Sequence, residues 1–254
     1  MTIKVASYNI HKSVGSDGQR RPDRIFAVLA ELDADIVALQ EVDRRFGARA
    51  TTFEAEQLEH ETGYRLVRHA VRPLSSGWHG NAILVRGAIT PLAGRRLTLP
   101  ALEPRGALMI DLDVGEAEPL RVVAAHLGLV GRYRRRQAEA ILEALAADQR
   151  QLPTVVMGDL NEWSSRGGCL RVFAQKLCVA APGPSFPARR PLFGLDRIIT
   201  SQNLEVLRAG VHHTPTAREA SDHLPVTAEV RLSEAAASGE QQTATLREST
   251  GTAS

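Results

Sequence analysis

The sequence is poor in cysteine and in long apolar runs, and each shortage excludes a class of protein. Its two cysteines, Cys169 and Cys178, are too few for a disulfide framework or a paired-cysteine metal site. This shortage favours a reducing compartment, so we predict a cytoplasmic protein. The longest apolar runs are about five residues, against the roughly 20 that a bilayer-spanning helix needs. We therefore expect no transmembrane segment, and the opening MTIKVASYNI lacks the apolar core of a signal peptide.

Aromatic residues and net charge are also scarce. Aromatics make up 4% of the chain, so a stacking platform for single-stranded nucleic acid is not indicated. The formal net charge of +2 is too small to attract polyanions in bulk. Apolar residues reach 43% of 254 residues, which is enough for a sizeable core, and we predict one domain over residues 1–232 and a monomer. Residues 233–254 contain one leucine and no aromatic, and this composition predicts a disordered tail.

Short apolar runs rich in β-branched residues predict many strands. The predicted strands are Ile3–Ala6, Asp35–Leu39, Ala82–Val85, Leu108–Leu112, Arg121–Ala125, Thr154–Met157, Arg197–Thr200, Val206–Val211 and Val226–Val230. Helices are predicted from Pro22, over Tyr133–Ala147, and from a capping box at Thr51-x-x-Glu54 to Gly63. Many strands and few helices in mixed order predict an α/β sandwich rather than an alternating parallel sheet.

Several predicted strands have chemically useful polar residues at one end. These residues are Asn9, Gln40, Glu41, His126, Asp159, Asn161, Asp196, Asp222 and His223. If the strand ends share one edge of a sandwich, the side chains converge on one cleft. Crowded carboxylates repel each other unless a cation or protons intervene. Because Asn9, Glu41, Asp159, Asn161 and Asp222 all offer oxygen ligands, Mg²⁺ or Mn²⁺ is the expected ion, and phosphoryl chemistry the expected reaction.

Seven motifs in order carry a family resemblance. They are SYNIHK, LQEVD, HGNAILVR, AAHLGL, GDLNEW, LDRI and SDHLP, and they extend from about Ile3 to Val230. Through these motifs and their order, the chain resembles the endonuclease/exonuclease/phosphatase superfamily. The resemblance implies a four-layer, deoxyribonuclease-like fold, in which helices flank a two-sheet β-sandwich. It also implies metal-assisted hydrolysis of phosphate esters.

The resemblance implies a role for each matching position. Glu41 is the main metal carboxylate, with Asn9 and Asp222 as further metal ligands. Asp159 orients or deprotonates the attacking water, and Asn161 donates to the phosphate oxygens. His223 pairs with Asp196 at the scissile phosphate, as a base or as a charged phosphate ligand, and His126 contacts the same phosphate and helps the leaving group. Asn81 is a substrate-side residue, and Arg105 is a phosphate clamp because a guanidinium can bind two phosphate oxygens at once.

Two departures separate the chain from better-defined branches of the superfamily. The deoxyribonuclease branch supports its equivalent of His126 with a carboxylate from the segment that matches Trp78-His79, and no acid stands there. The tryptophan-bearing opening of abasic-site endonucleases is replaced by YNIHK. The predicted substrate is therefore left as nucleic acid, an anionic phospholipid headgroup or a small phosphoester. The alternative function is a non-catalytic phosphate-binding module that kept the fold.

Three basic or polar segments are assigned by position alone. Arg132, Arg134, Arg135 and Arg136 either steer a polyanion or form a solvated helix face. Asp43, Arg44 and Arg45 are interpreted as a solvated loop, and His11 as a surface residue.

Overall fold

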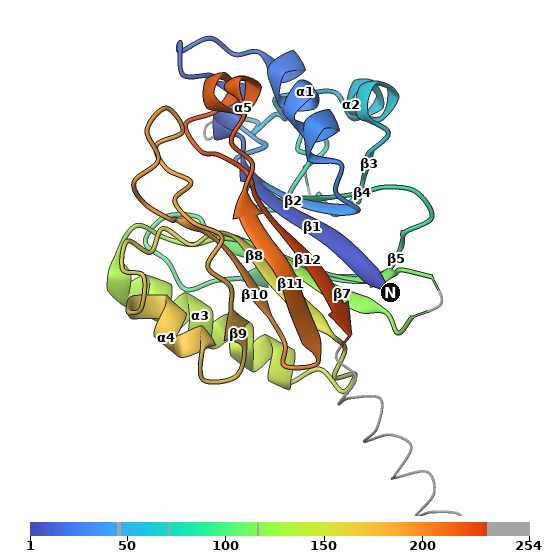
Figure 1. Cartoon of the computed structure of the whole chain (residues 1–254), viewed down its shortest axis with the longest axis vertical. Helices are drawn as coiled ribbons and strands as arrows, with labels where there is room; N and C mark the ends of the chain where they lie inside the picture. Colours follow the sequence, from blue (N-terminus) through green and yellow to red (C-terminus); the bar gives the residue numbers. More distant parts are fainter. Residues whose placement is uncertain (45–46, 71, 116, 233–254) are drawn as a thin grey trace, which may run out of the picture.

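The structure is a computed structural model, and it describes residues 1–44, 47–70, 72–115 and 117–232. The predicted tail, residues 233–254, lies outside the described residues. Two six-stranded sheets dominate the architecture, and five helices flank them (Figure 1). This confirms the predicted two-sheet sandwich.

The first sheet carries both ends of the described chain. In spatial order it contains β11 (Leu204–Val211), β12 (Val226–Leu232), β1 (Thr2–Asn9), β2 (Ile36–Gln40), β4 (Ala82–Val85) and β3 (Arg65–Leu66). β1 and β2 are parallel, and the other neighbours are antiparallel.

The second sheet repeats this plan. In spatial order it contains β5 (Thr90–Thr98), β6 (Gly106–Asp113), β7 (Leu120–His126), β8 (Thr154–Asp159), β10 (Asp196–Thr200) and β9 (Cys178–Val179). Here β7 and β8 are the parallel pair. Each sheet thus has one central parallel pair among antiparallel strands.

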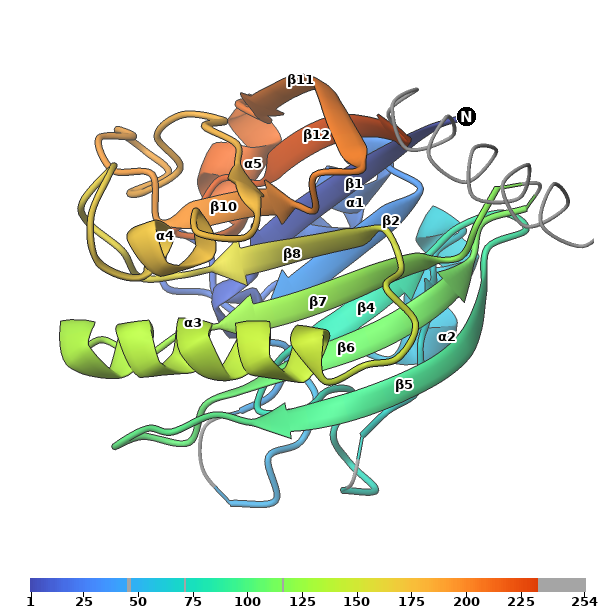
Figure 2. The ribbon, with the colours of Figure 1, turned by 90° about the horizontal axis from the view of Figure 1, so that it is seen from below.

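The helices lie on the outer faces of the two sheets (Figures 1 and 2). They are α1 (Pro22–Leu32), α2 (Ala55–Thr62), α3 (Gly131–Ala146), α4 (Gly168–Phe173) and α5 (Pro215–Ala220), and a short 3₁₀ turn, η1, covers His11–Ser13. One apolar cluster fills the space between the sheets and includes Val5, Ile110 and Met157. A second lies under α1, α2 and α5, and a third under α3 and α4. The molecule therefore has four layers.

The strand directions explain why the polar strand ends meet. The parallel pairs β1–β2 and β7–β8 have their carboxyl ends at common edges, where Asn9 neighbours Gln40 and His126 neighbours Asp159. β10 runs antiparallel to β8, so its first residue, Asp196, lies opposite Asp159. A strand that runs the opposite way delivers its start to the edge where its neighbour ends. Residues at the ends and starts of different strands therefore share one end of the sandwich.

The helix predictions were right in part. α1 begins at Pro22, as predicted, and Gly63 ends α2 in the left-handed conformation (φ 72°). The capping box was wrong: the N-cap of α2 is Glu54, no side chain caps the helix, and the Thr51 hydroxyl instead pairs with Ser76 at 2.8 Å. α3 begins two residues earlier than predicted, at Gly131. β5 was missed because its residues are mostly exposed and form no apolar run.

Candidate active site

A buried cluster of two carboxylates and an imidazole forms the centre of the site. Asp159 at the end of β8 and Asp196 at the start of β10 lie opposite each other, and His223 comes from the segment before β12. His223 Nδ1 lies 2.9 Å from Asp196 Oδ2, and Nε2 lies 3.8 Å from Asp159 Oδ2. All three residues are at most 5% exposed. His223 thus bridges two carboxylates inside the protein, as its predicted pairing with Asp196 requires.

The protonation of this cluster follows from burial and mutual charge. Burial alone disfavours the imidazolium, but the charge and hydrogen bond of Asp196 outweigh it and raise the pKa of His223 to about 10. Burial raises the pKa of Asp159 to about 6; the charge of His223 opposes this rise and that of Asp196 adds to it. Around neutral pH the cluster therefore holds a protonated His223 and an Asp159 carboxylate close to its own pKa.

Asp159 is held by amide donors on both oxygens. The Asn9 side chain donates to Oδ2 at 3.0 Å, and the Asn161 backbone N–H donates to Oδ1 at 2.9 Å. The Asn161 amide in turn donates to the Leu127 carbonyl at 3.0 Å. Asn161 has φ 49°, a left-handed conformation that Asn tolerates better than most residues. The local sequence Asp-Leu-Asn thus fixes the orientation of the carboxylate.

His126 joins the cluster from the adjacent strand. It ends β7 in register with Asp159, and its Nε2 lies 3.4 Å from Asp159 Oδ2. Gly158 makes this approach possible, because a Cβ there would lie 1.7 Å from the Ala125 carbonyl oxygen. The structure brings His126, Asp159, Asn161, Asp196 and His223 together at one place.

Glu41 lies on the other side of the site and is paired with a cation. It follows β2 with φ 58°, and its carboxylate forms a short ion pair with Lys12 Nζ. Burial would raise the pKa of Glu41, but the hydrogen bond and charge of Lys12 lower it overall. A non-glycine residue in this backbone conformation costs energy and is found preferentially at functional sites. Glu41 is therefore an ionised carboxylate held by a strained turn.

Asp222 occupies a more open position than the other carboxylates. Its side chain is 40% exposed and lies 3.7 Å from His11 Nδ1, so His11 belongs to the site margin rather than to the general surface. The neighbouring Ser221 hydroxyl donates to the Asn9 backbone carbonyl at 2.7 Å. This bond ties the His223 segment to the end of β1, where Asn9 stands.

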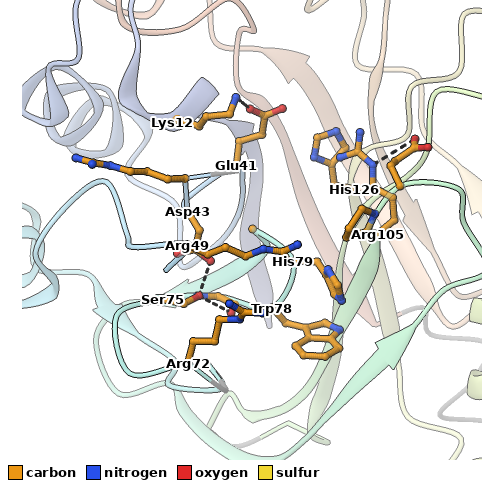
Figure 3. Close-up of a pocket in the computed structure, with 15 residues that line it drawn as sticks. Lys12, Glu41, Asp43, Arg49, Arg72, Ser75, Trp78, His79, Arg105 and His126 are labelled. Atoms are coloured by element: carbon orange, nitrogen blue, oxygen red, sulfur yellow. Dashed lines mark hydrogen bonds and ion pairs between the residues drawn. The ribbon is translucent and has the colours of Figure 1, made fainter. Parts of the chain in front are cut away.

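A cavity of about 580 Å³ opens beside the cluster (Figure 3). Glu41, His126 and Arg105 are among its lining residues. Arg105 is 8% exposed, and its Nε lies 3.7 Å from Glu103. Asn81 is fully buried, and its amide donates to the Trp78 and Gly106 carbonyls at 3.1 and 2.9 Å. These contacts fix the cavity wall, and substrate binding by Asn81 stays a prediction.

Sequence reasoning missed several residues that the structure places at the site. Lys12 pairs with Glu41, the Ser185 hydroxyl donates to Asp196 Oδ2 at 2.5 Å, and the Phe186 ring lies 4.8 Å from that of His223. Trp163 and Phe193 continue this aromatic contact at 4.7 Å and are exposed. Lys12 could have been found from its place in the YNIHK motif. Ser185 and Phe186 carry no signal in the sequence, since they lie on an irregular segment.

The donor chemistry fits a hard divalent cation. The nearby side chains offer carboxylate and amide oxygens, and one oxygen of Asp196, Oδ1, is buried without a hydrogen-bond partner among the described residues. One ligand atom each from Asp159, Asp196 and His223 lies within 4.8 Å of the others, but the protonated His223 is itself the cation of this group. The nearby oxygen ligands suit Mg²⁺ or Mn²⁺ better than a thiolate-binding metal.

The arginine cluster at the start of α3 contains one buried and three exposed side chains. Arg134 is 7% exposed, donates to the Leu129 carbonyl at 2.6 Å and pairs with Glu162 at 3.4 Å. It therefore anchors α3 to the segment after β8. Arg132, Arg135 and Arg136 are exposed.

Comparison with known proteins identifies the family. Residues 6–223 match the model of the Endonuclease/Exonuclease/phosphatase family, and the chain belongs to that family. It is also 30% identical over 258 residues to the protein of Escherichia coli strain K12 named "Uncharacterized protein YbhP". The alignment covers 91% of this chain and 97% of that protein.

Solved structures share the fold at lower sequence identity. An endonuclease/exonuclease/phosphatase from Bacteroides vulgatus is 18% identical with a TM-score of 0.74, covering 92% of this chain and all of that one. The mannosyl-6-phosphatase Bt3783 of Bacteroides thetaiotaomicron is 20% identical with a TM-score of 0.70, covering 91% and 100%. The human Nocturnin catalytic domain, solved with a bound sulfate anion, is 22% identical with a TM-score of 0.70, covering 91% of this chain and 95% of that one.

Within the described residues, no helix has the length and apolarity to cross a bilayer.

Proposed function

We propose that the protein is a Mg²⁺- or Mn²⁺-dependent phosphodiester hydrolase. The observation that carries this proposal is the buried Asp159–His223–Asp196 cluster at the end of the sandwich. Burying two carboxylates and a protonated imidazole costs free energy, and ionisable groups with strongly shifted pKa values concentrate at catalytic sites. Family membership supports the same reaction class.

The geometry supports a defined role for each group. Asp159, with its pKa raised to about 6, accepts a proton from the attacking water. His223 is protonated at neutral pH and therefore binds the phosphate oxygens as a cation rather than acting as the base. The water oxygen bonds to phosphorus as the bond between phosphorus and the leaving oxygen breaks, and His126, 3.4 Å from Asp159, passes a proton to the leaving oxygen and is restored by the proton that Asp159 accepted. Asn161 and Arg105 are the proposed donors to the remaining phosphate oxygens.

Glu41, Asn9 and Asp222 are the proposed ligands of the cation, with oxygens from the ends of β2 and β1 and from the segment before β12. When bound, the ion would neutralise charge on the phosphate and polarise its phosphorus–oxygen bonds. Lys12 already holds the Glu41 carboxylate in one orientation. Lys12 thus positions Glu41 while keeping it ionised.

The test is hydrolysis of bis(p-nitrophenyl) phosphate with Mg²⁺ or Mn²⁺, with and without chelator. We expect turnover that the chelator abolishes, and we expect Glu41→Gln to lose this metal-dependent turnover while its circular dichroism stays that of the wild type. Asp17→Asn, an exposed carboxylate paired with Arg24, is the matched control and keeps full activity. Turnover of Glu41→Gln at the wild-type rate would remove Glu41 from the site.

The second candidate, a phosphate-binding module without catalysis, makes a different prediction in the same assay. It would bind inorganic phosphate with no metal-dependent turnover of any phosphodiester. The complete set of Glu41, Asp159, Asn161, Asp196 and His223 favours the enzyme.

A further inference from the structure

We propose that the cavity beside the catalytic cluster binds a second anionic group of the substrate, and that the substrate class is therefore a phosphate ester carrying a further phosphate. Arg49 and Arg72 are the groups assigned to it. This inference rests on the proposed function for the identity of the reacting phosphate, but not for the existence of the anion site.

The cavity is larger than a single phosphate needs. Its volume of about 580 Å³ falls in the range of sites that enclose whole small molecules, roughly 300–1,000 Å³. Glu41 and His126 line its catalytic part, while Arg49, Arg72 and Trp78 line its far part (Figure 3). A substrate that reacts at the cluster can therefore extend toward the two arginines.

The far part of the cavity carries more positive than negative charge. Five basic and three acidic side chains line the whole cavity. Two of the acids lie with partners near the cluster, Glu41 with Lys12 and Glu103 with Arg105. Among the residues that the structure describes, no carboxylate forms an ion pair with Arg49 or Arg72.

Asp43, the third acid, forms its hydrogen bonds with the neighbouring Ser75–Ser76 segment. Its Oδ2 accepts the Ser75 hydroxyl at 2.5 Å, and its Oδ1 accepts the Ser76 backbone N–H at 2.9 Å. At 8% exposure Asp43 is not part of the predicted solvated loop, whereas Arg44 is exposed and Arg45 lies outside the described residues. The hydrogen bonds of Asp43 hold the Ser75–Ser76 segment, and the charge of Arg49 acts on Asp43 without a direct ion pair between the two, so the guanidinium of Arg49 can still bind a ligand.

His79 marks where the positive charges converge. Figure 3 shows the Arg49 side chain extending toward it. Burial lowers the pKa of His79, and the charges of Arg49, Arg72 and Arg105 lower it further, so three guanidinium groups act on one imidazole. Its Nδ1 is buried and has no hydrogen-bond partner among the described residues. An anion in this place would neutralise the arginines and could use a ring nitrogen of His79.

The turn that carries His79 is rigid and joined to the catalytic side. Trp78 and Asn81 exchange backbone hydrogen bonds of 2.8 and 3.0 Å, and His79 itself has φ 51°. Gly80 packs on the Glu41 backbone, since a Cβ there would lie 3.5 Å from Glu41 Cα, and its carbonyl accepts the Val42 N–H at 3.1 Å. His79 and Glu41 are thus joined through one backbone unit, so an anion bound beside His79 lies at a defined distance from Glu41, as selection of a substrate by the spacing of two phosphates requires.

The first experiment measures binding without catalysis. Inorganic phosphate and tripolyphosphate are titrated calorimetrically into the metal-free, full-length protein at low ionic strength. We expect tripolyphosphate to bind the wild type at least tenfold more tightly than phosphate, and the double variant Arg49→Gln/Arg72→Gln to lose that advantage. The control, Arg189→Gln/Arg190→Gln, removes the same charge from two exposed residues that do not line the cavity, and keeps it. Equal loss in both double variants would show only a general charge effect and would overturn the proposal.

The second experiment measures specificity with two chromogenic diesters that differ by one phosphate. They are the p-nitrophenyl ester of thymidine 5′-monophosphate and its 3′-phosphorylated counterpart. We expect Arg49→Gln/Arg72→Gln to raise KM at least tenfold for the bisphosphorylated ester, with kcat and the constants for the other ester within about twofold. A wild type that favours the ester without the second phosphate would refute the substrate class. Absence of any turnover would refute the proposed function, while the calorimetry would still decide the anion site.

Discussion

Asp196 governs the charge of His223, and the exchange Asp196→Asn tests this dependence directly. The substitution keeps the shape of the side chain and removes its charge. Asp196 is fully buried and lies 2.9 Å from His223 Nδ1. It is the main reason why the pKa of His223 rises to about 10 although burial acts in the opposite direction. Without the carboxylate, burial dominates and the pKa of His223 should fall by several pH units.

The size of the effect follows from linkage. The pKa of His223 changes from 6.5 to about 10 on folding, and each pH unit corresponds to about 1.4 kcal/mol, so the protonation of His223 contributes on the order of 5 kcal/mol in total, with Asp196 as the main source. For a group whose pKa is raised on folding, this stabilisation is fully present below the unfolded value of 6.5 and is lost as the pH rises through about 10. The stability gap between wild type and Asp196→Asn should therefore be large at about pH 6 and shrink by several kcal/mol at about pH 10.

Two measurements on the metal-free protein check this reasoning. Urea unfolding of both proteins across that pH range gives the stability gap. Long-range ¹H–¹⁵N spectra of the histidine rings give the protonation of His223, which we expect to be complete at neutral pH in the wild type and lost in the variant. Asp17→Asn, which removes an exposed carboxylate, controls for net charge. A wild-type His223 that titrates near 6.5, or a gap that does not change with pH, would refute the account.

Two further substitutions test how the fold supports the site. Gly158→Ala places a Cβ 1.7 Å from the Ala125 carbonyl oxygen, so β7 and β8 must separate. We expect the free energy of unfolding in urea to fall by about 3 kcal/mol and phosphodiester turnover to be lost. A stable, active variant would contradict the close approach of the two strands. Arg121 is 2% exposed and holds Asp111 at 2.7 and 3.1 Å; it lies near the start of β7, at the opposite end of that strand from His126. Arg121→Leu leaves Asp111 with the half-exposed Arg150 alone, so we expect a loss of about 3–5 kcal/mol with unchanged kcat below the melting range, and a loss below about 1 kcal/mol would show that the pair contributes little.

Much of the architecture could be read from the sequence, because apolar periodicity reports burial directly. All nine predicted strands correspond to observed ones, and the polar residues at their ends lie together at one end of the sandwich. β5 escaped prediction because an exposed strand has no apolar period. The capping box at Thr51 failed because Ser76, far along the chain, competes for the hydroxyl that would have capped the helix.

The sequence by itself determined the fold class and which side chains gather, since strand ends and residue types are local properties. The tertiary structure alone decided the protonation and pairing of those side chains. The pKa of His223 depends on Asp196, 27 residues away, and on burial by both sheets. Lys12 reaches Glu41 only because β1 and β2 end side by side. Charge interactions depend on the distance between groups in space and on the surrounding dielectric, not on separation along the chain. The arginine-lined cavity likewise consists of residues that only folding brings together, so the sequence alone did not predict it.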